Sequence, residues 1–224
     1  MIGRNDMKNR SMTAAASLLA IALASPADGY AKDKKIKVVA TITTYGYIAK
    51  VVGGDRVKVI TLAKGHQDPH FVQPKLSLAE KLAGADLFID TGLDLEMWVP
   101  ALQDVAGNKK ILSGAIGYVS ASKGCHLVEI PKIADRKEGG VHLYGNPHLY
   151  HRPVAQRQIA RNIATGLGKV DPAGKETYKK NAKKFVARLD RSLFGEDLVK
   201  LLGGNKLAKL AEKGKLISFL EQND

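Results

Sequence analysis

Short apolar runs alternate with segments of helical spacing along the first half of the chain. The strand-like runs cover residues 36–42, 57–63 and 86–90, and a further one follows residues 108–112. The segments with apolar residues at three- and four-residue intervals are 45–52, 77–85 and 95–106. Strands that alternate with helices in this way are typical of an α/β protein. We therefore expect a Rossmann-like lobe, an open sheet flanked by helices.

The second half of the chain has only the helical period. Residues 153–167 open with Pro153 and repeat apolar residues on one face, and Gly168 is expected to end this helix. Asp171 and Pro172 then begin a longer helix, predicted over residues 171–203. Another basic helical segment covers residues 206–220. Residues 120–145 show little periodicity and are rich in glycine and charge, which predicts a long connection of the kind that carries binding residues.

The first 31 residues have the pattern of a secretory signal peptide. Lys8 and Arg10 precede the apolar run 12–24, which is too short to span a bilayer, and a small-residue cleavage pattern ends at Ala31. We expect cleavage there and a soluble exported protein that begins near Lys32. No cysteine lies near the cleavage point, so we expect no lipid anchor.

Composition narrows the kind of site that the chain can hold. The 224 residues carry 35 Lys and Arg against 22 Asp and Glu, a net charge of +13, but only 6% aromatic residues and scattered lysines. This distribution lacks a nucleic-acid-binding signature, and we expect no nucleic-acid partner. The single cysteine, Cys125, excludes an internal disulfide and a cysteine-rich zinc module. A metal would have to be held by histidine and carboxylate side chains.

Two histidines directly follow prolines, His70 in the loop after the second strand and His148 at the end of the long connection. Proline fixes its own φ and restricts the residue before it, so each histidine leaves a stiff turn in a set direction. Loops at the carboxyl ends of parallel strands are the usual ligand sites of open α/β sheets. We therefore take His70 and His148 as candidate metal ligands.

The other histidines lack such a constraint. His66, His142 and His151 are expected to be solvated, and the Cys125–His126 pair to be too poorly organised for a metal. Asp68 has two open interpretations: it orients the His70 ring, or it closes a turn through its own side chain.

The stretches Gln67–Ser77 and Ala85–Trp98 resemble the metal-binding solute-binding proteins of zinc and manganese ABC importers. Gly145–His148 is similar to the second signature of that family. Asp171-Pro172 and the helix that follows are similar to the helix that links the family's two lobes. The resemblance runs from about Ile36 to Leu193. It implies two α/β lobes that clamp a divalent ion for a membrane permease, with His70 and His148 as the first lobe's two ligands.

The chain differs from this family at two points. Tyr150-His151-Arg152-Pro153 stands where the family usually has Trp-Leu-Asp-Pro, and nothing after Leu193 matches the motifs of the family's second lobe. We expect a signal peptide at 1–31, a metal-binding lobe at 32–170, a linking helix at 171–203 and the start of a second lobe at 204–224. With only two matched ligands, the chain is expected to bind zinc weakly and to release it between about pH 6 and 7.

The preferred interpretation is a monomeric periplasmic protein that binds zinc, with manganese as the alternative ion, and delivers it to the permease of an ABC transporter. An exported metal-dependent hydrolase is the alternative from another class. It is disfavoured because no acidic residue stands at the spacing of a general base beside either histidine. A third interpretation, a basic surface-binding protein, rests on the net charge alone.

Overall fold

The computed structural model describes residues 35–131 and 142–223, and its centre is a four-stranded sheet. The strands are β1 (Ile36–Ala40), β2 (Val57–Thr61), β3 (Leu87–Asp90) and β4 (Tyr118–Ser120). All of them are parallel and their order is β2-β1-β3-β4. The predicted α/β sheet is therefore confirmed. Because β1 and β3 lie inside the sheet, they are the most apolar strands, and Val38, Val39 and Ala40 are at most 1% exposed.

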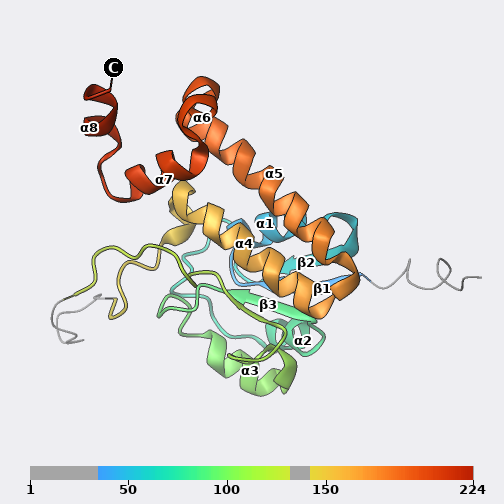
Figure 1. Cartoon of the computed structure of the whole chain (residues 1–224). Coiled ribbons are helices and arrows are strands. Elements are labelled where there is room, and N and C mark those ends of the chain that lie inside the picture. Colours follow the sequence, from blue (N-terminus) through green and yellow to red (C-terminus); the bar gives the residue numbers. More distant parts are fainter. Residues whose placement is uncertain (1–34, 132–141, 224) are drawn as a thin grey trace, which may run out of the picture. The chain divides into compact units, whose positions relative to one another are not determined.

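Helices cover both faces of this sheet (Figure 1). Three of them lie on one side: α1 (Thr43–Gly53), α4 (Pro153–Val170) and α5 (Lys175–Phe194). The other side carries α2 (Leu76–Ala83) and α3 (Val99–Ala106), which pack against each other. Short 3-10 turns complete this part: η1 (Gly54–Arg56), η2 (Lys109–Ile111), η4 (Leu149–His151) and η5 (Pro172–Gly174). Each strand crosses to the next through a covering helix, as in a Rossmann-like lobe.

The end of α4 differs from the prediction. Gly168 was expected to end this helix, but α4 continues to Val170. The glycines of this turn serve close packing instead: a Cβ on Gly166 would lie 2.2 Å from Val119 of β4, and one on Gly168 would lie 3.0 Å from Lys175 of α5. Tertiary contacts therefore explain both glycines, and the helix absorbs their weak helix propensity.

The helix expected over residues 171–203 is interrupted. After η5, α5 runs to Phe194, and Gly195 with a φ of 81° separates it from α6 (Glu196–Leu202). The predicted segment 206–220 likewise consists of α7 (Gly204–Glu212) and α8 (Leu216–Glu221). All described residues fall in one compact unit. The division into lobe, linking helix and second lobe stays a prediction.

A buried ion pair fixes α5 and α7 on α4. The Arg157 guanidinium lies on the Asp190 carboxylate with Nε–Oδ1 at 2.6 Å, and both side chains are less than 10% exposed. Nη2 of Arg157 also donates to Oδ1 of Asn205 at the start of α7. This pair holds the C-terminal helices against the face of the lobe.

Two further expectations concern residues that the structure does not describe. The signal peptide at 1–31 lies outside the described residues, as does part of the long connection, residues 132–141. In the described ranges, none of the helices combines the length and the apolar character that a membrane crossing needs.

Candidate metal centre

His70 is held by a turn that its own neighbours build. Oδ1 of Asp68 accepts from the backbone N of His70 at 2.9 Å and from ring Nδ1 at 2.7 Å, and the backbone N of Phe71 donates to the carbonyl of Asp68. Nε1 of Trp98 donates to the carbonyl of Pro69 at 2.7 Å, which ties the turn to the start of α3. The two interpretations of Asp68 therefore hold together: it closes the turn and orients the ring. The hydrogen bonds that Asp68 accepts from His70 lower the pKa of the Asp68 carboxyl, and the bond from the backbone N has the larger effect.

His148 has the same local geometry. Oδ1 of Asn146 accepts a hydrogen bond from the backbone N of His148 at 2.9 Å, with Pro147 between them. Asp68 accepts the same kind of hydrogen bond from the backbone N of His70. Gly145 precedes the turn with a φ of 93°, a conformation that favours glycine. Leu149 follows at the start of η4 and is fully buried, which anchors the turn just before α4. The repeated Asx-Pro-His sequence thus encodes two equivalent turns.

Tyr150 replaces the family's tryptophan and contacts the site. Its hydroxyl lies 3.1 Å from Nδ1 of His148. Burial, followed by the positive charge of the neighbouring histidines, lowers the pKa of His148, and burial raises the pKa of the Tyr150 hydroxyl. The shift at His148 favours the neutral ring that a metal requires. Arg152 does not enter the site, because its Nη1 donates to the carbonyl of His126.

The expectation for His142 was wrong. This side chain is not solvated but only 23% exposed, and Asp94 holds it at two points. Oδ1 of Asp94 lies 3.0 Å from Nδ1 of His142, and Oδ2 accepts from the backbone N of Leu143 at 3.2 Å. Asp94 lies in the loop after β3, so sheet topology brings it to the same edge as the loop after β2.

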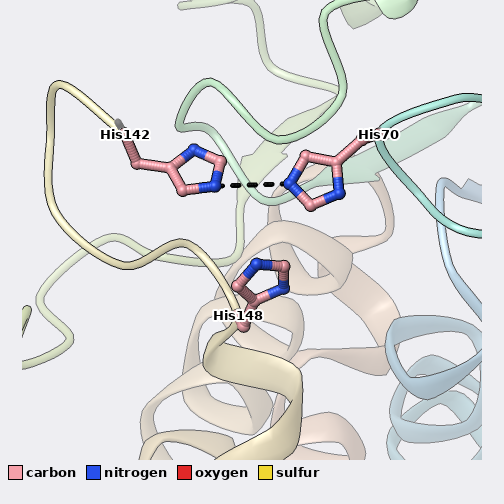
Figure 2. Close-up of side chains that lie close together, drawn as sticks. All are labelled: His70, His142 and His148. Carbon is pink, nitrogen blue, oxygen red and sulfur yellow. Dashed lines mark hydrogen bonds between the residues drawn. The ribbon is translucent and has the colours of Figure 1, made fainter. Parts of the chain in front are cut away.

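The structure brings His70, His142 and His148 together (Figure 2). Their ring centroids lie 5.1 to 5.6 Å apart, and one ligand nitrogen from each ring falls within 4.8 Å of the others. Nε2 of His70 and Nε2 of His142 are 3.3 Å apart. In all three rings an oxygen contacts Nδ1, so Nε2 is the nitrogen left for a metal. Three imidazoles arranged in this way can hold a divalent transition metal.

The other histidines stay out of the cluster. His66, His126 and His151 are exposed. Cys125 is half-buried, its thiol is directed at the carbonyls of Ala121 and Ala155, and burial raises its pKa to about 11. A thiol that stays protonated is a poor metal ligand. The low expectation for the Cys125–His126 pair stays a prediction.

A buried carboxyl group lies beneath the site at the ends of β1 and β3. Glu96 is 5% exposed and accepts hydrogen bonds from the hydroxyl of Thr41 and from the hydroxyl and backbone N of Thr91. Burial raises the pKa of Glu96, and burial and the charge of Glu96 raise the pKa of Asp90 to about 7. These groups join the strand ends to the Asp94 loop and support the edge of the sheet on which the histidines lie.

A polar pocket of about 520 Å³ opens beside the cluster. His70, His148 and Tyr150 border it, together with the loop after β2 and the start of α1.

The sequence prediction missed three residues of this centre: Asp94, His142 and Tyr150. Tyr150 follows His148 by two positions, so a local contact was a detectable signal. The link from Asp94 to His142 spans 48 positions and has no local signal.

Comparison with known proteins identifies relatives of this architecture. The family model of ZnuA, described as the periplasmic component A of a zinc-uptake complex, matches residues 38–192. The zinc-binding lipoprotein AdcA of Streptococcus pneumoniae is 30% identical over 175 residues, which cover 78% of this chain and 34% of AdcA. The high-affinity zinc uptake system protein ZnuA of Bacillus subtilis is 31% identical over 191 residues, 84% of this chain and 56% of that protein.

A solved structure is also similar to this chain. The metal-dependent lipoprotein YcdH of Bacillus subtilis superposes with a TM-score of 0.56 at 30% identity, over 75% of this chain and 54% of YcdH. The chain thus spans between one third and somewhat more than half of the length of these relatives.

Proposed function

Because the chain belongs to the ZnuA family, the periplasmic A components of zinc-uptake complexes, we propose that it captures a divalent metal ion at His70 and His148. The ion is zinc, with manganese as the alternative, and the recipient is the membrane permease of an ABC importer. One observation carries this proposal: the two Asx-Pro-His turns aim two imidazoles at one point beside a polar pocket. Rings held in place before the ion arrives lower the ordering cost of binding.

The site suits binding and release more than catalysis. A hydrolase needs a general base within reach of a metal-bound water. The nearest carboxylates, Asp68 and Asp94, are engaged with ring Nδ1 atoms, and Glu96 is buried under two threonine hydroxyls. Members of the family are solute-binding proteins, and we expect no turnover from this chain.

We place the protein in the periplasm, where it acts as a monomer. The family description supports this location. The relatives AdcA and YcdH are named lipoproteins, which conflicts with the expectation of a chain without a lipid anchor. The proposal therefore covers the compartment and not the mode of attachment.

Isothermal titration of the full chain with zinc tests the proposed function. We expect His70→Ala and His148→Ala each to weaken binding by more than about 100-fold, beyond the loss typical of a residue that only orients a ligand. His66→Ala is the matched control, since this exposed histidine lies four positions before His70 in the same loop. It should change affinity by less than about threefold. Equal losses in the three variants would contradict a defined site.

A further inference from the structure

We propose that His142 is a third metal ligand, and that the three imidazoles form a zinc-selective site contained in this single lobe. The inference rests on the proposed function, whose ligands are His70 and His148, and adds a residue that lies in neither Pro-His turn. It also reverses the expectation that the lobe holds zinc only weakly.

The spacing of the ring nitrogens matches a metal. Zinc binds imidazole nitrogen at about 2.0–2.1 Å, and in a tetrahedral shell two such nitrogens lie about 3.3–3.4 Å apart. Nε2 of His70 and Nε2 of His142 are separated by 3.3 Å. The His148 nitrogen lies within 4.8 Å of both, so a change in its side-chain torsions of modest size completes the triangle.

The hydrogen bonds of the two rings leave a place for a cation between them. With the Asp68 and Asp94 carboxylates as acceptors, the Nδ1 atoms of His70 and His142 are the donors. In the tautomer with the proton on Nδ1, each ring has an unshared electron pair on Nε2, and the two Nε2 atoms lie 3.3 Å apart. Two acceptors at this distance repel each other unless a proton or a metal ion lies between them. A metal ion removes that repulsion and uses both pairs as ligands.

His142 is positioned as carefully as the other two histidines. Asp94 fixes the ring through Nδ1 and the backbone through the N of Leu143, and the backbone N of Gly145 donates to the carbonyl of His142. A carboxylate that accepts from the second nitrogen of a ligating histidine is the usual arrangement in metal sites. Asp94 is therefore a positioning residue for this third ligand.

The donor set points to zinc more than to manganese. Imidazole suits zinc, whereas manganese favours carboxylate and water oxygens. The carboxylates nearest the cluster, Asp68 and Asp94, are bonded to Nδ1 atoms and so serve the imidazoles instead of the ion. Three nitrogen ligands leave one tetrahedral position, which water from the adjoining pocket can fill.

The first test counts ligands. X-ray absorption of the zinc-loaded full chain should give three imidazoles in the wild type and two in His142→Ala. In competition with a chelator, His142→Ala should weaken zinc binding by more than about 100-fold, and Asp94→Asn by about 10- to 100-fold. His126→Ala and His66→Ala, both exposed, are the controls and should change affinity by less than about threefold. Circular dichroism confirms that each variant is folded.

The second test uses manganese. The ratio of zinc to manganese affinity should fall at least tenfold in His142→Ala, because the loss of an imidazole harms zinc more than manganese. Two imidazoles in the wild type, or His142→Ala with unchanged zinc affinity, would overturn the third ligand. If His70→Ala and His148→Ala still weakened binding in that case, the proposed function would stand without it. If all three variants bound as the wild type does, both proposals would fail.

Discussion

The ion pair between Arg157 and Asp190 allows a quantitative test of how α5 is fixed to the lobe. Replacement by Asp190→Ala leaves the Arg157 guanidinium, 8% exposed, without its carboxylate partner. The remaining contact to Asn205 is a single neutral acceptor at 2.6 Å. Removing one partner of a buried pair costs about 3–5 kcal/mol, since a buried charge stays unpaired. We therefore expect the free energy of unfolding to fall by about that amount.

The loss is large enough to measure by two methods. In a chain of this size, each kcal/mol shifts Tm by about 2–4 °C, so Tm should fall by about 6–20 °C. Urea titration followed by circular dichroism should give a lower midpoint with an unchanged m-value. Both measurements need a chelator in the buffer, because bound metal would stabilise the folded state by mass action.

A surface ion pair on the same helix is the matched control. Lys179 and Glu176 pair at 2.8 Å, with side chains 57% and 81% exposed. Such a pair contributes about 0–1 kcal/mol, so Lys179→Ala should have little effect. The double replacement Arg157→Met with Asp190→Leu removes both buried charges and should recover most of the loss. If Asp190→Ala cost no more than Lys179→Ala, the pair would not be buried in solution and this account of α5 would be wrong.

Two further variants test other contacts. Asp171 accepts hydrogen bonds from Arg56 at 2.8 and 2.9 Å, and these bonds lower the pKa of the Asp171 carboxyl. The stabilisation of the folded state by this pair is therefore fully present above the unfolded-state pKa of about 3.9. It is lost as the pH falls through the lower pKa of the folded state. Arg56→Gln should therefore lower the urea midpoint at pH 7 and approach the wild type below about pH 3. Trp98→Phe removes the hydrogen bond to the carbonyl of Pro69 and should weaken zinc binding about tenfold, through the turn that carries His70. Unchanged affinity in a chelator competition would show that this anchor does not position the turn.

The sequence determined those features whose causes are local. Apolar periodicity predicted the strands and the helices between them, because burial of one face depends on spacing within each element. The Asx-Pro-His turns were also readable: proline restricts its neighbours, and Asp68 and Asn146 accept hydrogen bonds from backbone atoms two positions away. The positions of His70 and His148 as paired candidates followed from these turns.

Tertiary structure decided what depends on distant partners. His142 was expected to be solvated, and only the loop after β3 brings Asp94 to it from 48 positions away. Gly168 was expected to end α4, whereas packing against Lys175 explains that glycine. Gly195 separates α5 from α6, so the segment expected to be one helix over residues 171–203 is interrupted. A one-dimensional pattern records the preference of each segment, but the contacts that complete a metal centre arise only when the sheet brings its loops to one edge.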